Sequence, residues 1–115
     1  SDGALYGLAR LSHSAPEAAN EVLSALSSDS NPDRQRVALR SIGHAQTSHP
    51  DVILGIAPIL RSQDASLARE AVTTVTMLGA RADALRPELD RLARSMSDRE
   101  LAALAAAAIK ALDRR

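Results

Sequence analysis

Residues 67–79 read LAREAVTTVTMLG, and the centre of this stretch, at 72–76, is the run VTTVT. Five consecutive β-branched residues are the composition expected of a β-strand. The chain around them has the composition of a helical protein, so the run is either an isolated strand or a helix built from unfavourable residues. The structure of this stretch therefore decides the fold class.

The composition of the 115-residue chain favours an all-α domain. The chain contains no Phe, Trp or Cys and a single aromatic residue, Tyr6, while Ala occurs 23 times. Ala and Leu are strong helix formers, and small side chains allow helix axes to approach closely. At this length the chain is one domain that can bury a hydrophobic core without disulfides.

A pattern of small and aliphatic residues recurs along the chain. Residues 67–79 align with 101–113 at an offset of 34 and with 34–46 at an offset of 33. The matched positions are spaced i, i+4, i+8 and i+11, which is one face of a helix. Placing five β-branched residues in a helix costs roughly 2 to 3 kcal/mol relative to Ala, whereas burying Leu67, Val75 and Leu78 returns about 1.5 to 3 kcal/mol each. We therefore expect a helix over 67–79.

Three further segments begin with proline and carry apolar residues at helical spacing, at 16–28, 50–62 and 87–97. Proline suits the first turn of a helix, and the acidic residue that follows each one is favourable at the positive end of the helix dipole. Together the segments predict seven helices: a leading helix over 1–12 and three helix pairs over approximately 13–46, 47–79 and 80–115.

The boundaries of these helices are predicted from local signals. Asn31, Asp64 and Ser97 are the expected N-caps of the second helix of each pair. Pro58 is expected to kink its helix or to end a short first half. The loop over 80–86 is longer than its counterparts, so we expect a small insertion there.

Helix pairs of about 34 residues, with an Asp in the turn inside the pair, resemble HEAT repeats, especially the compact bacterial type. The resemblance is carried by NPDRQRVALRSIGHA at 31–45, DASLAREAVTTVTMLG at 64–79 and SDRELAALAAAAIKALD at 97–113. It implies an α-α superhelix, or solenoid, in which the first helix of each pair lines the convex side and the second lines the concave side. Armadillo-like or tetratricopeptide-like stacking is the alternative, although the Trp and Phe of a tetratricopeptide pattern are absent.

The resemblance also implies a ladder in which the turn Asp pairs with an Arg early in the second helix. Asp33 with Arg36 and Asp64 with Arg69 match this pattern approximately. The third pair departs from it, because it has Ala102 and Ala103 where an Arg would be needed.

Charge and motifs disfavour several classes of function. Fourteen basic and fourteen acidic residues cancel, whereas a protein that binds nucleic acid normally has a basic excess. No segment approaches 18 uninterrupted apolar residues, so we expect no membrane insertion. His13, His44 and His49 have no His or carboxylate partner at i+3 or i+4 on the same predicted helix, which a metal site typically has. Because nucleophile motifs and glycine-rich phosphate loops are also absent, we expect no catalysis and no cofactor.

The outward positions of the second helices stack into rows in the repeat register, which predicts a partner-binding concave face. Tyr, Arg and Met are enriched at interfaces, although any one exposed Arg or Met is ordinary. The candidate residues for binding a protein or peptide are Tyr6, Arg10, Arg36, Arg40, His44, Arg69, Thr73 and Met77.

The last predicted helix is apolar on every side, although packing on the preceding repeat needs only one stripe. Alanine can simply favour helix formation on a featureless surface. The alternative is that Leu104, Ala107 and Ala111 are covered by another repeat, another domain or a second copy of the chain. The start at Ser1, on half a repeat, likewise favours a fragment of a longer protein.

These observations favour a non-catalytic scaffold or adaptor that binds a protein or peptide. One alternative is an accessory role to an enzyme, because HEAT-like repeats occur in bilin lyases and in a family of DNA glycosylases. The lack of stacking aromatic side chains and the zero net charge speak against the glycosylase. A third possibility is a structural, self-associating module. Thirteen of the fourteen basic residues are Arg, which is associated with GC-rich bacterial genomes.

Overall fold

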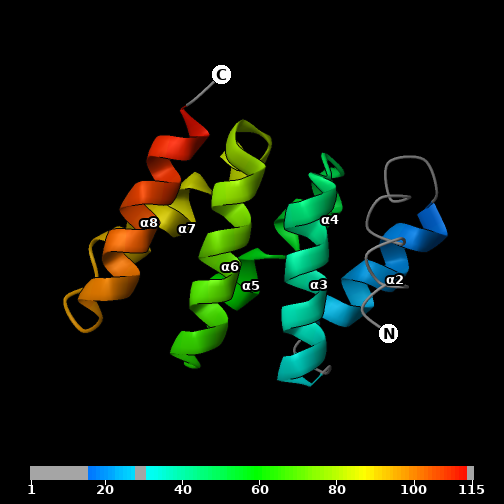
Figure 1. Ribbon diagram of the computed structural model, residues 1–115, viewed down its shortest axis with the longest axis horizontal. Helices are drawn as coiled ribbons and strands as arrows, with labels where there is room; N and C mark the ends of the chain where they lie inside the picture. Colours follow the sequence, from blue (N-terminus) through cyan, green and yellow to red (C-terminus); the bar gives the residue numbers. More distant parts are fainter. Residues whose placement is uncertain (1–15, 28–30, 114–115) are drawn as a thin grey trace.

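A computed structural model describes residues 16–27 and 31–113, which form helices joined by short turns (Figure 1). Within these two stretches no residue lies in a β-strand, so the predicted all-α class is confirmed there. The predicted leading helix over 1–12 lies outside the described residues. The elements are α2 (Pro16–Leu26), α3 (Pro32–Ala45), α4 (Pro50–Leu54), α5 (Ala57–Leu60), α6 (Ala65–Leu78), the 3-10 helix η1 (Gly79–Leu85), α7 (Arg86–Ala93) and α8 (Arg99–Leu112).

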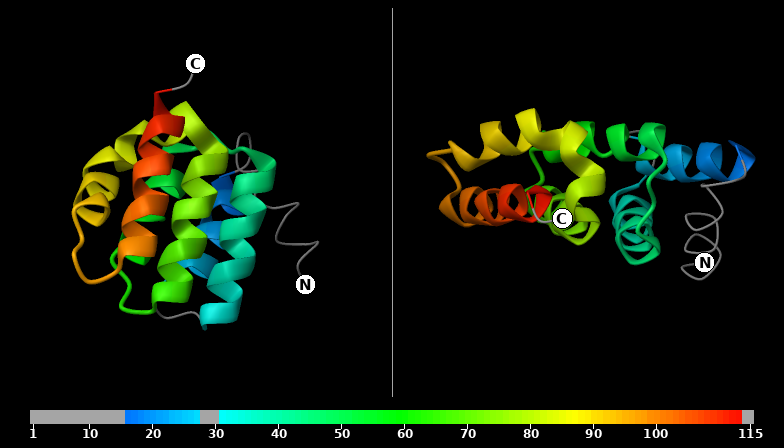
Figure 2. Two further views of the ribbon diagram at one scale, coloured as in Figure 1. Left: turned by 60° about the vertical axis from the view of Figure 1, so that its left-hand side comes forward. Right: turned by 90° about the horizontal axis from the view of Figure 1, so that it is seen from above.

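The helices form two layers. In one layer α6 lies between α3 and α8, and all three run in the same direction (Figure 1). In the other layer α2 packs against α3, α5 against α6, and α7 against α8 (Figure 2). The shortest dimension of the molecule is 18 Å, which fits two layers of helices whose axes lie about 8 to 10 Å apart.

The run VTTVT lies inside α6, so the prediction of a helix over this stretch is confirmed. Val72 and Val75 are buried in the core. Thr74 is also buried, and its hydroxyl donates a hydrogen bond to the Leu39 carbonyl of α3 at 2.9 Å. Thr73 and Thr76 are exposed, and each donates to the carbonyl four residues earlier. Packing against α3 therefore outweighs the low helix propensity of the run.

The three long helices of the first layer begin in the same way. Asn31, Asp64 and Asp98 each accept a hydrogen bond from a backbone N–H three residues later, at 2.8, 3.2 and 2.9 Å. The predicted caps at Asn31 and Asp64 are confirmed, but the prediction of Ser97 is wrong by one residue. Asp98 has the extended backbone of an N-cap, whereas the hydroxyl of Ser97 lies 3.2 Å from that of Ser95.

Two breaks fall close to their predicted places in the second layer. The helix containing Pro58 is divided into α4 and α5, and Gly55 and Ile56 lie between the two parts. The predicted loop over 80–86 is mostly the 3-10 helix η1, so this segment is helical and not an open loop. Gly79 opens this element with a φ of +58°, a conformation that residues with a Cβ rarely adopt.

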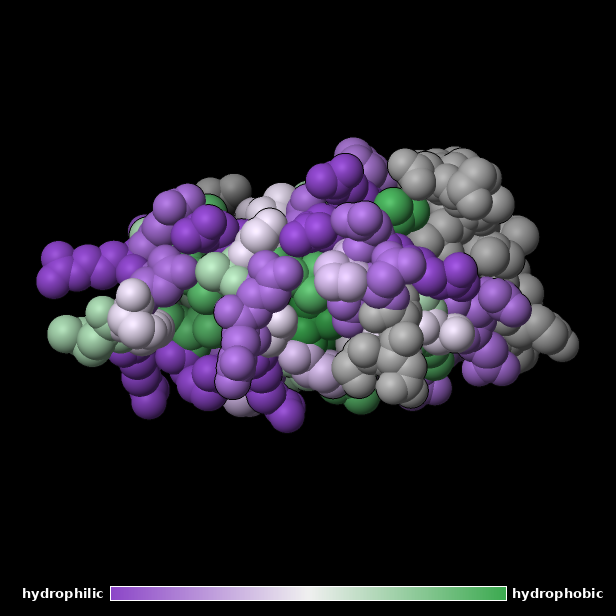
Figure 3. Space-filling view, turned by 90° about the horizontal axis from the view of Figure 1, so that it is seen from below, coloured by the Kyte–Doolittle hydropathy of each residue, from purple (hydrophilic) through white to green (hydrophobic). Residues whose placement is uncertain are grey.

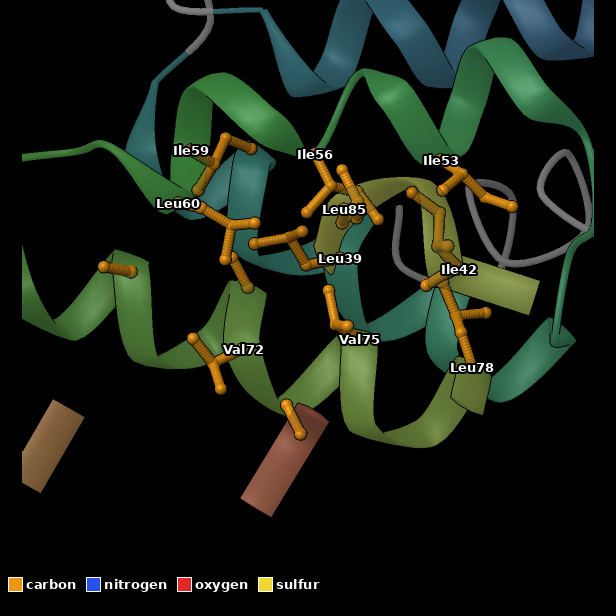
Figure 4. Packing of buried hydrophobic residues seen from close by; sticks show 14 of the residues in the cluster. Leu39, Ile42, Ile53, Ile56, Ile59, Leu60, Val72, Val75, Leu78 and Leu85 are labelled. Carbon is orange, nitrogen blue, oxygen red and sulfur yellow. The ribbon is translucent and has the colours of Figure 1, made fainter. Parts of the chain in front are cut away.

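The core is built from aliphatic side chains of both layers. Figure 4 shows Leu39 and Ile42 of α3 pointing toward Val75 and Leu78 of α6, with residues of the 53–60 segment covering them. Gln35 is one of the polar residues buried among them. Its buried amide donates to the carbonyls of Leu26 and Ser27, at 3.1 and 3.2 Å, which satisfies acceptors at the end of α2.

Candidate partner-binding face

The outward side of α3, α6 and α8 forms one continuous surface, which we call the front face and which is turned toward the viewer in Figure 1. Exposed residues define it at equivalent positions of the three helices: Arg40 and His44 on α3, Thr73 and Met77 on α6, and Ala107 on α8. Tyr6 and Arg10, which belong to the same predicted rows, lie outside the described residues. The partner-binding role of these residues stays a prediction.

Arg36 and Arg69 are half-buried, and each forms an ion pair with the aspartate that caps the next long helix. Arg36 lies 3.2 Å from Asp33 and 3.7 Å from Asp64, while Arg69 lies 3.5 Å from Asp98 and 3.6 Å from Glu100. The predicted pairing of Asp33 with Arg36 is confirmed. The predicted pairing of Asp64 with Arg69 is wrong, because a separation of five residues does not place two side chains on one face of a helix.

Asp64 and Asp98 each interact with two helices at once. One carboxylate oxygen of Asp64 caps α6 and the other faces Arg36 of α3, and Asp98 does the same for α8 and Arg69. Figure 3 shows the end of the molecule at which these helices begin, where hydrophilic side chains cover most of the described surface. This ladder fixes the longitudinal register of α3, α6 and α8.

Arg40 is also paired across helices. Its guanidinium donates to one oxygen of Glu70 at 3.0 and 2.7 Å. Each of the three predicted binding arginines of the described chain thus contacts a carboxylate of the same molecule. Their charge is already partly compensated, which lowers their value as contacts for an anionic partner.

Met77 of α6 packs against α3. It is 37% exposed, and a Cβ placed on Gly43 of α3 would lie only 2.9 Å from its sulfur. The lack of a side chain at Gly43 is therefore what lets Met77 lie against α3. A flexible thioether in this position can adapt to differently shaped partners.

The predicted terminal interface is divided by the structure. Leu104 is half-buried against the core and Ala107 is exposed, but Ala111 is only 8% exposed. The backbone carbonyl of Ala111 also lies close to Gly79 of η1. The expectation that Ala111 requires another repeat or another chain to cover it is therefore corrected, because this chain covers it. Ala103, Ala106 and Ala107 are the exposed apolar residues of α8.

The opposite layer contains a charge cluster that the sequence reasoning missed. Glu88 of α7 is 20% exposed and lies 2.7 Å from Arg61 and 3.5 Å from Arg91. The hydrogen bond from Arg61 is the main cause that holds the pKa of Glu88 below its usual value. The sequence marks Glu88 only as the acidic residue after Pro87. No sequence signal indicates its partner Arg61, which lies 27 residues earlier.

The described part of the chain has neither a candidate metal site nor a helix that could cross a membrane. There, no group of three or more His, Asp or Glu side chains is placed to hold a metal ion. His44 is exposed on α3, and His49 is the N-cap residue of α4, while His13 lies outside the described residues. No helix in the described part of the chain is both long and apolar enough to cross a membrane.

Comparisons of the chain with protein-family models, with curated proteins and with solved structures find no match. The evidence for function is therefore the geometry and the charge of the two layers described above.

Proposed function

We propose that the chain is a solenoid of stacked helix pairs that acts as a non-catalytic scaffold and binds a protein or peptide through the front face. The observation that supports this most directly is the side-by-side packing of three 14-residue helices, α3, α6 and α8. A layer of parallel helices offers a broad, rigid surface, which is the surface that helical repeat proteins use for binding.

Equivalent positions of the three helices support the reading of a repeat. The caps Asn31, Asp64 and Asp98 are separated by 33 and 34 residues, the same offsets that align the sequences. At these offsets Ala38, Ala71 and Ala105 are all fully buried. Arg40, Thr73 and Ala107 are all exposed at these offsets. Each helix thus turns the same face toward the core and the same face outward.

The character of the front face changes from one helix to the next. It is charged on α3, carries hydroxyl groups and a methionine on α6, and is bare alanine at 103, 106 and 107 on α8. Since Arg36, Arg40 and Arg69 are paired within the chain, α6 and α8 offer the more available contacts. A partner that covers this part of the face would bury mainly small and apolar groups.

Site-specific photo-crosslinking tests this proposal. A benzoyl-phenylalanine placed at Thr73 lies on the front face, and the same residue placed at Leu54 lies at an exposed position of the other layer. We expect the Thr73 variant, expressed in its native host, to form a discrete heterologous adduct that the Leu54 variant does not form. Adducts from Leu54 alone, or from neither position, would argue against binding through the front face.

Self-association through α8 is a second candidate, favoured by the exposed alanines at 103, 106 and 107. Close helix packing through small residues would be disrupted by a bulky charge at their centre. We expect Ala107→Glu to reduce the mass measured by light scattering at high concentration if this candidate holds. An unchanged monomer mass for both proteins would exclude self-association and leave the heterologous partner.

A further inference from the structure

A groove of about 590 Å³ opens where α6 ends and η1 begins. Thr76, Met77 and Leu78 of α6 line one part of it, and Gly79, Ala80 and Arg81 of η1 line another. Ala111, near the end of α8, completes the lining. The groove is therefore mostly apolar, has one charged residue, and shares Met77 with the front face.

The charged residue, Arg81, is exposed and forms no ion pair with any described residue. This distinguishes it from Arg36, Arg40 and Arg69, whose carboxylate partners were given above. No acidic residue lines the groove. The charge of Arg81 is thus available to a ligand.

A neighbouring arginine, Arg86, pairs with the nearby acidic side chains. Arg86 lies 2.8 Å from Asp83 and 2.6 Å from Asp113, which are the acidic residues nearest to the groove in sequence. The hydrogen bonds that Arg86 donates to these two carboxylates raise its pKa, led by the bond to Asp113. Arg86 pairs with both carboxylates, and neither of them forms an ion pair with Arg81.

We propose that this groove binds an acidic peptide segment of a partner protein, with an Asp or Glu side chain paired to Arg81 and an apolar side chain packed on the exposed Met77 and Ala80. The proposal rests on the proposed function, because the groove adjoins the front face, and it specifies the chemistry of the partner. Charge complementarity assigns the acidic group, and the apolar lining assigns the side chain beside it. A small inorganic anion would leave that lining uncovered, and therefore fits the groove less well than a peptide.

Fluorescence polarisation with three labelled peptides tests the charge preference. The probe is a nine-residue peptide containing four Glu and three Leu, and the matched peptides carry Gln or Lys in place of every Glu. We expect the Glu peptide to bind the full chain about tenfold more tightly than the Gln peptide, and the Lys peptide not to bind. Equal affinity for the Glu and Gln peptides would overturn the proposal.

Matched variants then locate the site. Arg81→Gln should weaken binding of the Glu peptide about tenfold, while Arg94→Gln should not. Arg94 is also exposed and forms no ion pair with a described residue. It is the C-cap residue of α7 and does not line the groove. Equal effects of the two variants would contradict the proposal, because they would indicate attraction to net charge. Both side chains are exposed, so thermal unfolding should be unchanged and a loss of binding cannot be ascribed to misfolding.

Two further readouts distinguish the possible failures. Stronger binding of phosphatidylserine vesicles than of the Glu peptide, lost in Arg81→Gln, would assign the groove to a membrane surface and overturn the peptide proposal. If the Thr73 crosslink to a partner persists in Arg81→Gln with unchanged yield, the acidic-peptide proposal fails while the proposed scaffold function stands. Loss of the crosslink in Arg81→Gln supports both.

Discussion

Thr74 accounts for the least expected feature of the sequence. A β-branched residue in the middle of a helix is unfavourable by propensity, but this one is buried and hydrogen-bonds to the Leu39 carbonyl of the neighbouring helix. Ser41 is the buried polar residue 33 positions earlier. Thr73 and Thr76, the two exposed threonines near Thr74, donate hydrogen bonds only within their own helix, α6.

Replacing the buried hydroxyl should therefore destabilise the protein. Thr74→Val keeps the shape of the side chain and removes its hydrogen bond to Leu39, so we expect the free energy of unfolding to fall by about 1 kcal/mol. Thr73→Val, which removes an exposed hydroxyl, should change it by less than about 0.5 kcal/mol. Urea unfolding of both variants measures the difference. Equal effects would mean that the bond between α3 and α6 contributes nothing.

Glu88 predicts how stability depends on pH. Its pKa is lowered in the folded protein, mainly by the hydrogen bond from Arg61, so the folded state favours the ionised carboxylate. This contribution is present above the unfolded pKa, about 4.3, and is lost as the pH falls through the lower folded value.

The wild type should accordingly be more stable than Glu88→Gln at pH 7, and the difference should shrink as the pH falls below about 4. Thermal unfolding of the two proteins between pH 7 and pH 3 measures this. Glu21→Gln is the matched control, because Glu21 is exposed and has no ion pair to a described residue. A gap between wild type and Glu88→Gln that is independent of pH would contradict the role given to the carboxylate.

At the scale of the elements, the N-caps decide where the three long helices begin and how they are linked. Asp98 caps α8 through one oxygen and faces Arg69 of α6 through the other. A capping residue is worth about 1 kcal/mol, whereas a surface ion pair contributes less. The cap therefore contributes more to the stability of the protein than the ion pair does.

Three variants separate the contribution of the cap from that of the ion pair. Asp98→Ala removes both the cap and the ion pair, and should lower the free energy of unfolding by about 1 to 2 kcal/mol. Asp98→Asn keeps a capping side chain and should cost only a few tenths of a kcal/mol. Ser97→Ala should leave the free energy of unfolding unchanged. A loss as large as that of Asp98→Ala would mean that Ser97 is the N-cap residue and would contradict the assignment of Asp98. Urea unfolding provides all three values.

Most elements could be predicted from the sequence, because the spacing of apolar residues and the prolines mark them. The boundaries were less certain wherever two signals competed. Ser97 and Asp98 are both good caps, and only the offset of 34 from Asp64 selects Asp98. Pro58 predicts a break in its helix, but the helix is interrupted at Gly55 and Ile56, just before the proline. Proline itself is accepted in the first turn of α5.

The candidate site was less predictable than the helices. The rows of exposed positions on α3 and α6 follow from helical periodicity. The partners that Arg36, Arg40 and Arg69 find at the neighbouring helix do not follow from it, because each of these carboxylates lies about 30 residues away in the chain. Ala111 resembled its exposed neighbour Ala107 in sequence, and only the position of η1 shows that it is covered.

At the scale of the whole molecule, both proposals depend on α3, α6 and α8 forming a row. Three helices around a common axis would have no continuous front face, and the groove beside Arg81 would have different walls. In the row, α6 separates α3 from α8 (Figure 1). Equivalent exposed positions on the outer helices should then lie further apart than those on neighbouring helices.

The direct measurement of this arrangement is electron spin resonance with pairs of nitroxide labels at Arg40, Thr73 and Ala107. The chain contains no cysteine, so engineered cysteines at these exposed positions are labelled selectively. Because packed helices lie about 8 to 10 Å apart, we predict that the 40–107 distance exceeds both the 40–73 and the 73–107 distances by about that amount. A 40–107 distance equal to or shorter than the other two would contradict the row of helices and, with it, the front face.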